Sequence, residues 1–244
     1  MKFGAKLLLE NGISFDGIGF GFKKIGVGEV VFNTSITGYQ EILTDPSYDG
    51  QIITFTYPHI GNTGINFEDN ESKNIAARGL IVKNFCDFPS NHRSKMSLEE
   101  FLIEQKTICI SDIDTRHLTK ILRDEGCKIG AIYPTQHFTD EEAISEIKKF
   151  GSMDGKNFTE NVAVSAPYNF GDPGTKKKYK IVAVDFGIKE NILRIMKSLG
   201  GDIEVVPPNT SAETIKSLNP DGIFLSNGPG DPSVLQDAIK KLKK

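Results

Sequence analysis

At 244 residues, the chain is long enough for one large domain or two smaller ones. Its formal net charge of −3 gives no electrostatic reason to expect binding to nucleic acid or to an acidic membrane surface. The N-terminal sequence MKFGAKLLLENG has too short an apolar run for a signal peptide, and no later stretch approaches the roughly 20 apolar residues of a membrane helix. We therefore expect a cytoplasmic protein.

The cysteine pattern argues against structural metal or disulfide chemistry. Cys86, Cys109 and Cys127 are odd in number and show no CxxC spacing, which is unlike a disulfide framework or a zinc site. Cys109 lies in an apolar run at residues 107–111 that is typical of a buried strand. Its thiol is therefore expected to be a small side chain of the core.

The first part of the chain begins with strand patterns. Apolar runs at residues 6–10 and 13–15 flank Asn11-Gly12, which is the strongest short signal for a β-hairpin. Further strands are expected from runs of β-branched and other apolar residues. These runs lie at residues 29–32, 51–56 and 79–82.

Helix patterns follow in the same part. Ser97 and Thr139 each precede a glutamate by three residues, which is the capping-box pattern of a helix N-terminus. A third helix is expected at residues 115–124, with Gly126 just beyond its end. We expect residues 1–165 to form one mixed α/β domain whose beginning is rich in strands.

A linker is expected at residues 166–178 (APYNFGDPGTKKK), because proline, glycine and charge are concentrated there. The lysine run at residues 176–178 could be a binding patch. Three charges make a weak patch, however, so a solvated end of the linker is the simpler interpretation.

After the linker, strands and helices alternate. Strands are expected at residues 180–184, 204–206 and 222–225, and a helix should follow each of them, the last running to residue 244. This alternation predicts βαβ units and a parallel sheet over residues 179–244. In the usual strand order the third strand has no strand beyond it, which exposes an apolar edge. That suggests a truncated chain or a partner that covers the edge.

The loop after the third strand, Ser-Asn-Gly-Pro-Gly-Asp-Pro at residues 226–232, lies where α/β proteins bind ligands. Gly228 and Gly230 let backbone N–H groups approach a ligand without a Cβ in the way, and Pro229 stiffens the loop. Such a pair of donors is suited to the oxyanion that forms when a carboxamide is attacked. The spacing alone also fits a plain strand-to-helix turn.

A second polar segment, residues 28–48, leads from a strand through a glycine-containing loop to the turn Thr44-Asp-Pro-Ser47. The Ser47 hydroxyl can both donate and accept a hydrogen bond. Taken alone, a serine after Asp-Pro is also an ordinary turn residue. Ser47 is therefore a candidate whose role the local pattern leaves open.

Two other patterns do not point to a site. Asp185-Phe-Gly187 matches a tripeptide of protein kinases, but it follows the first strand of a βαβ run and no glycine-rich ATP loop accompanies it. The four histidines are scattered along the chain without the spacing of metal ligands.

Four stretches, in order, carry a resemblance to a known family. They are residues 28–66 (with GYQEILTDPSY and TYPHIGN), 110–116 (ISDIDTR), 185–194 (DFGIKENILR) and 219–232 (NPDGIFLSNGPGDP). Together they resemble the small subunit of carbamoyl-phosphate synthetase. Gly-Pro-Gly-Asp-Pro alone would fit many class I glutamine amidotransferases. The N-terminal motifs are what narrow the resemblance to this small subunit. It implies that residues 179–244 are the first part of an amidotransferase domain with a flavodoxin-like parallel sheet.

The resemblance also implies a function. The family's small subunit hydrolyses glutamine, and the ammonia passes to a large subunit that makes carbamoyl phosphate from bicarbonate and ATP for arginine and pyrimidine synthesis. By position, Ser47, Gly228 and Gly230 correspond to residues that bind L-glutamine. Ser47 would reach the glutamine site from the first domain. No cofactor is expected in this chain, because ATP and Mg²⁺ would belong to the large subunit.

The chain departs from the family in its catalytic residues. The family places a cysteine nucleophile on a strand-to-helix elbow beyond the segment that ends here, followed by a histidine and a glutamate. None of the three can be assigned, since every cysteine of this chain precedes the linker. A thiolate with a nearby base is indispensable to this chemistry. We therefore expect no glutaminase activity from the chain as given.

Two other interpretations remain. The chain could be a non-catalytic binding or scaffolding subunit whose first domain docks on the large subunit. It could also be an unrelated flavodoxin-like binding protein, although this accounts only for the second half of the sequence. An open reading frame encoding Gly-x-Cys-x-Gly beyond Lys244 would favour the enzyme, and an in-frame stop codon would favour the scaffold.

Overall fold

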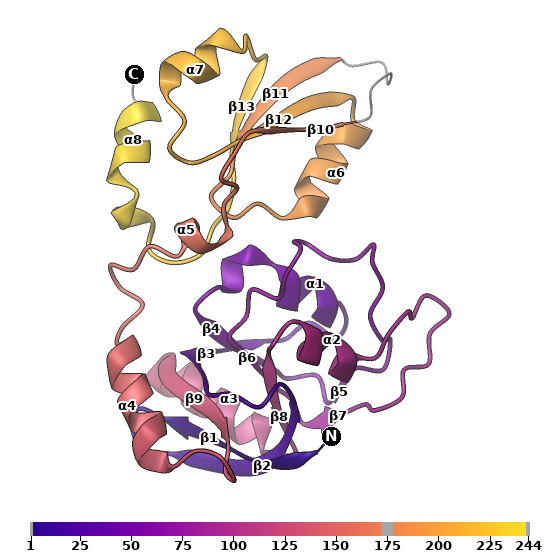
Figure 1. Ribbon diagram of the computed structural model, residues 1–244, viewed down its shortest axis with the longest axis vertical. Helices are drawn as coiled ribbons and strands as arrows, with labels where there is room; N and C mark the ends of the chain where they lie inside the picture. The colour runs from indigo at the N-terminus through magenta and orange to yellow at the C-terminus, as the bar shows by residue number, and fades with distance from the viewer. Residues whose placement is uncertain (1, 172–177, 243–244) are drawn as a thin grey trace. The chain divides into compact units, whose positions relative to one another are not determined.

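The computed structural model describes residues 2–171 and 178–242, which divide into two units, Met1–Met153 and Asp154–Lys244 (Figure 1). Each unit has its own sheet and its own apolar clusters. Most of the lysine run in the expected linker and the last two residues of the expected final helix lie outside the described residues.

A closed barrel forms the centre of the first unit, with strands in the order β1-β2-β8-β6-β4-β3-β9. The neighbours β3–β4, β4–β6 and β6–β8 run parallel, and the other pairs are antiparallel. The strand bounds are β1 (Phe3–Leu9), β2 (Ser14–Gly21), β3 (Gly26–Asn33), β4 (Gln51–Phe55), β6 (Gly79–Ile81), β8 (Ile108–Ser111) and β9 (Lys128–Pro134). A separate parallel pair consists of β5 (His59–Ile60) and β7 (Asn84–Phe85).

Alternating side chains fill both faces of the barrel strands. Leu7, Val30 and Ile52 are fully buried in one cluster that draws on strands all around the barrel. Their neighbours along the strands point the other way, so Ile53 and Cys109 belong to a second cluster under the helices. Cys109 is thus a core residue, as the sequence predicted.

The predicted hairpin and helix caps are confirmed in this unit. β1 pairs with β2 across the turn that contains Gly12, whose φ is +86°. Both capping boxes form: the Glu100 N–H donates to Ser97 Oγ, and the Glu100 carboxylate accepts from the Ser97 N–H at 2.7 Å. The helices are α1 (Tyr39–Thr44), α2 (Leu98–Glu104), α3 (Thr115–Glu125) and α4 (Asp140–Phe150).

The second unit is a layered α/β structure with the sheet order β10-β12-β11-β13. β11 runs parallel to both β12 and β13, and β10 is antiparallel to β12. α6 packs on one face of this sheet, and α7 and α8 pack on the other. The bounds are β10 (Tyr168–Phe170), β11 (Tyr179–Val184), α6 (Glu190–Ser198), β12 (Gly201–Val206), α7 (Ala212–Ser217), β13 (Gly222–Leu225) and α8 (Gln236–Leu242).

The structure divides the chain earlier than the boundary at residue 165 that composition suggested. Residues 154–165, which include α5 (Thr159–Val162), belong to the second unit. Within the expected linker, β10 pairs with β12 and Phe170 packs against the cluster of Leu193 and Ile203. A three-residue strand between proline and glycine leaves little trace in composition, because its stability comes from the neighbouring strand.

The third parallel strand, β13, lies at the edge of the described sheet, as expected. Ile223 and Leu225 are 52% and 45% exposed. Among the helices in the described parts of the chain, none has the length and apolar character to span a bilayer.

The capping box of α2 provides a test of the first unit. The substitution Ser97→Ala removes the hydroxyl oxygen that accepts the Glu100 N–H. We therefore expect the free energy of unfolding to fall by about 1 kcal/mol in urea denaturation at pH 7. The hydrogen bonds from Ser97 also lower the pKa of the Glu100 carboxyl, which therefore stabilises the folded state above its ordinary pKa. The difference between the two proteins should shrink as the pH falls through the lowered pKa.

Ser90→Ala is the matched control, because Ser90 is exposed and its hydroxyl has no recorded partner among the described residues. An equal loss of stability in both variants, or a difference that does not depend on pH, would contradict the assignment.

Candidate functional site

The loop at residues 226–232 lies at the carboxyl end of β13, beside the turn that follows β11. The Phe186 N–H donates to Ser226 Oγ at 2.8 Å, and the Asn227 side-chain amide donates to Gly187 O at 3.1 Å. These contacts form because β11 and β13 are parallel neighbours, so their carboxyl ends meet at one edge of the sheet. The loop is therefore fixed to the turn beside it.

Only glycine fits at two positions of this loop. A Cβ on Gly228 would lie 2.2 Å from Phe186 O. Gly230 has φ of +80°, and a Cβ there would lie 2.9 Å from Lys156 O. Pro229 between them is buried. Backbone atoms thus approach both glycines closely, and any other residue would displace the loop.

The two glycines offer backbone donors. In the part of the chain that the structure describes, no recorded hydrogen bond uses the N–H of Gly228 or of Gly230, and both residues are exposed. Donors that are held in place before a ligand arrives stabilise a negative oxygen without reorganisation. The loop is therefore suited to binding a carboxamide or carboxylate oxygen.

Residues 155–164, which we call the covering segment, run across the same loop. Phe158 is buried, and its ring lies 3.0 Å from the position of a Cβ on Gly230. The Gly155 N–H donates to Asp231 Oδ2 at 3.4 Å. Asp231 also accepts from the Ser233 N–H and hydroxyl, and these hydrogen bonds hold the pKa of the Asp231 carboxyl below its ordinary value. The Asp231 carboxylate thus holds the C-terminal end of the loop in place.

A buried carboxylate lies under the site. Asp185, directly after β11, is 2% exposed, and its oxygens accept three backbone N–H groups. Oδ1 accepts from Gly187 and Ile188 at 2.8 Å each, and Oδ2 accepts from Val164 at 2.8 Å. A buried carboxylate needs such donors, because an unpaired one would be strongly unfavourable.

Ser47, the third predicted residue, belongs to the first unit. It lies in a short 3₁₀ turn, Pro46–Tyr48, which is capped by Asp45. The Ser47 N–H donates to Asp45 Oδ1 at 3.0 Å, and the residue is partly buried. The predicted residues therefore fall into a pair in one loop of the second unit, Gly228 with Gly230, and a single serine in a turn of the first unit.

All three cysteines belong to the first unit. Cys109 is fully buried, and burial raises the pKa of its thiol well above the ordinary value. Burial and the nearby Glu29 carboxylate also raise the pKa of Cys127. Raised pKa values disfavour the thiolate, so neither thiol has the environment of a nucleophile.

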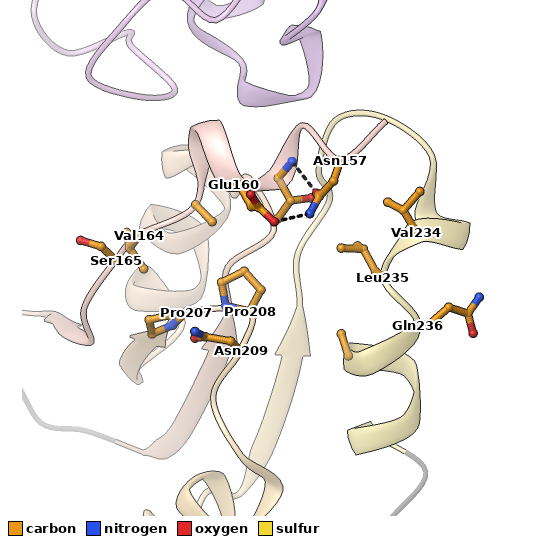
Figure 2. Close-up of a pocket in the computed structure, with 13 residues that line it drawn as sticks. Asn157, Glu160, Val164, Ser165, Pro207, Pro208, Asn209, Val234, Leu235 and Gln236 are labelled. Atoms are coloured by element: carbon orange, nitrogen blue, oxygen red, sulfur yellow. Dashed lines mark hydrogen bonds between the residues drawn. The ribbon is translucent and has the colours of Figure 1, made fainter. Parts of the chain in front are cut away.

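A pocket of about 680 Å³ opens elsewhere on the second unit (Figure 2). Its walls come from the covering segment, the turn after β12 and the start of α8. Glu160 is its charged lining residue, and the Glu160 carboxylate accepts from the Asn157 side chain at 2.9 Å. Neither Gly228 nor Gly230 lines this pocket. The open N–H donors lie in the loop at residues 226–232, so that loop and not this pocket is taken as the candidate site.

Within residues 2–171 and 178–242, histidine, cysteine, aspartate and glutamate side chains nowhere gather in a group of three or more that could hold an ion.

Two parts of this site escaped the sequence pattern. The covering segment was assigned to the first domain. Asp185 occurred in a kinase-like tripeptide and in the family stretch at residues 185–194, but neither pattern gave it a role. The available signal was a single acidic residue at the carboxyl end of an apolar parallel strand, which is a common position for functional residues.

Comparisons with known proteins agree with this organisation. A family profile described as "Carbamoyl-phosphate synthase small chain, CPSase domain" matches residues 7–132, and one described as "Glutamine amidotransferase class-I" matches residues 182–244. The second match begins in β11 and includes the loop with Gly228 and Gly230.

Several curated relatives are named "Carbamoyl phosphate synthase small chain". Those of Neisseria meningitidis serogroup B, Pasteurella multocida and Haemophilus ducreyi are each 48% identical over 98% of this chain. The alignments cover 66%, 64% and 68% of these relatives, so the chain spans about two thirds of their length. A solved aminopeptidase from Aneurinibacillus sp. strain AM-1 aligns over 92% of this chain and 58% of its own, with a TM-score of only 0.29 and 14% identity.

The first profile covers more than half of the chain, and relatives at 48% identity align over nearly all of it. The chain therefore belongs to the carbamoyl-phosphate synthase small chain family.

Proposed function

We propose that this chain is the glutamine-binding part of a carbamoyl-phosphate synthase small subunit. In the complete enzyme, this subunit would take ammonia from L-glutamine and supply it to a large subunit. The large subunit would combine the ammonia with bicarbonate, using ATP and Mg²⁺ at its own sites. The carbamoyl phosphate formed would serve arginine and pyrimidine synthesis.

The observation that carries the proposal is the pair of open N–H donors at Gly228 and Gly230, held at the carboxyl end of a parallel strand. The side chain of glutamine ends in a carboxamide, and attack on its carbon places negative charge on its oxygen. Fixed backbone donors stabilise that charge, and losing one typically costs about 10²–10³ in rate. Family membership supports glutamine as the ligand that brings this group to the loop.

Ser47 is proposed as a further contact to glutamine. The support is its place in the family's Thr-Asp-Pro-Ser motif and a hydroxyl that lies in a turn ordered by Asp45. A hydroxyl can accept from the substrate's ammonium group or donate to its carboxylate.

The chain should bind glutamine without hydrolysing it. No cysteine occurs among residues 154–244, and the thiols of Cys109 and Cys127 have raised pKa values. Hydrolysis of a carboxamide by this chemistry needs a thiolate beside the substrate carbon. The residues that would supply the thiolate and its base are absent from the sequence given.

A second candidate is a non-catalytic subunit that docks on a large subunit. The first unit supports it with exposed large apolar side chains, Ile36, Phe67 and Phe88, which are 74%, 74% and 86% exposed. This candidate shares the partner with the first proposal. It predicts binding of the large subunit without any contribution from glutamine.

The first test is a titration of the ¹⁵N-labelled chain with L-glutamine, followed by amide spectra. We expect the resonances of Gly228 and Gly230 to shift with saturation, because their N–H groups would contact the ligand. D-glutamine, with the same carboxamide, is the control for specificity. No glutamate should be released above the background rate. Absence of any shift up to millimolar L-glutamine would refute the glutamine site. Release of glutamate would refute the expectation that this chain does not hydrolyse glutamine.

The second test uses the loop glycines. Gly228→Ala places a Cβ 2.2 Å from Phe186 O, so we expect a loss of about 1–3 kcal/mol in unfolding free energy and at least a tenfold weaker glutamine affinity. Gly222→Ala is the matched control, because nothing lies within 4 Å of its added Cβ. Calorimetric titration and urea denaturation of both variants measure these effects. If the two variants had equal stability and equal glutamine affinity, the close contact between Gly228 and Phe186 O would be contradicted.

The third test concerns Ser47. Ser47→Ala should weaken glutamine binding about fivefold, the equivalent of one hydrogen bond of about 1 kcal/mol. The control Ser35→Ala removes an exposed hydroxyl with no recorded partner among the described residues, and it should bind like the wild type. An unchanged dissociation constant for Ser47→Ala would show that the Ser47 hydroxyl does not contact glutamine.

A further inference from the structure

We propose that Asp185 is a positioning residue for the Gly228–Gly230 loop. Its carboxylate joins the turn that supports the loop to the covering segment that crosses it. The consequence for ligand binding rests on the proposed glutamine function, whereas the effect on loop geometry does not.

The two oxygens of Asp185 serve two different parts of the chain. Oδ1 accepts the N–H groups of Gly187 and Ile188, which shapes the turn after β11. Oδ2 accepts the N–H of Val164, at the end of the covering segment. Because the carboxylate is 2% exposed, water cannot replace these donors when one is lost.

The turn held by Oδ1 is in direct contact with the loop. Gly187 has φ of +124°, and a Cβ there would meet Pro229 at 3.0 Å and Gly228 Cα at 3.3 Å. Gly187 O accepts the Asn227 side-chain amide, and the Phe186 N–H donates to the loop's first serine. Any shift of this turn therefore moves the backbone that carries the Gly228 N–H.

The segment held by Oδ2 reaches the other glycine. At its beginning, the Gly155 N–H donates to Asp231, which follows Gly230 directly. Lys156 O and Phe158 lie against the α-carbon of Gly230, at 2.9 and 3.0 Å from the position of an added Cβ. One carboxylate thus secures the neighbours of both N–H donors.

An asparagine cannot perform both tasks. Its side chain has the same shape as aspartate, but one acceptor oxygen is replaced by an NH₂ group that only donates. If the carbonyl continues to accept from Gly187 and Ile188, the NH₂ group faces the Val164 N–H, and two donors oppose each other. Asp185→Asn should therefore keep the turn and release the covering segment.

The experiment compares the ¹⁵N-labelled 244-residue wild type with Asp185→Asn and with Asp221→Asn. Asp221 is the matched control, because its exposed carboxylate accepts the Lys180 N–H at 2.7 Å at the opposite end of β11. Without ligand, Asp185→Asn should shift the amide resonances of Gly228 and Gly230, and the shift at Gly230 should be the larger because the turn beside Gly228 is kept. Its dissociation constant for L-glutamine should rise about tenfold, at a temperature where urea curves show that all three proteins are folded. Asp221→Asn should change neither quantity.

Val164→Pro tests the same link without altering Asp185. It removes the N–H that Oδ2 accepts, and the preceding Ala163 has φ −72° and ψ 154°, which a following proline allows. We expect a larger shift at Gly230 than at Gly228, because only the covering segment is released. This variant decides the question if Asp185→Asn fails to fold.

The outcomes separate the two proposals. Unchanged Gly228 and Gly230 resonances in folded Asp185→Asn, or in Val164→Pro if the first does not fold, would overturn the positioning role. Lower stability with an unchanged glutamine dissociation constant would overturn it as well, because that is the result of a purely structural role. If the wild type itself does not bind L-glutamine, the glutamine function fails, and the ligand-free resonances still decide whether Asp185 positions the loop.

Discussion

The parallel pairing of β11 with β13 is the constraint on which the second unit depends. It brings the carboxyl ends of two strands to one edge of the sheet, where the backbone must turn and its polar groups need partners. The buried Asp185 carboxylate accepts two of these N–H groups, from Gly187 and Ile188, and also the Val164 N–H of the covering segment; Ser226 Oγ accepts the Phe186 N–H. Among the residues that the structure describes, the N–H groups of Gly228 and Gly230 have no recorded acceptor, whereas the backbone groups of the turn beside them are paired.

The two units differ in how the edges of their sheets are paired. Its barrel closes on itself, so each barrel strand has a partner on both sides, and alternating side chains fill the interior and the layer under the helices. The second unit instead leaves β13 with one recorded partner and with Ile223 and Leu225 about half exposed. An open parallel edge is less favourable than a closed barrel, because its backbone groups and apolar side chains meet water.

Contacts between residues far apart in the sequence are common to the features that local patterns missed. β9 was not predicted, although Lys128–Pro134 pairs with both β1 and β3. Gly130 interrupts its apolar run, yet a Cβ there would lie 2.7 Å from Val30, so the glycine is what allows the strands to pack. The covering segment was likewise assigned to the first domain. Its contacts with Asp231 and Gly230 join residues more than 70 positions apart, which no local pattern records.

The sequence by itself determined the elements whose signals are local. The Asn11-Gly12 hairpin, the capping boxes at Ser97 and Thr139 and the alternation of strands and helices after residue 179 depend on residues within a few positions of one another. Family motifs also singled out Gly228 and Gly230. Only the tertiary structure decided that the barrel closes, that residues 154–165 belong to the second unit and that Asp185 holds two distant segments. These features arise from long-range hydrogen bonds and packing, which depend on the positions of groups in space and not on their order in the chain.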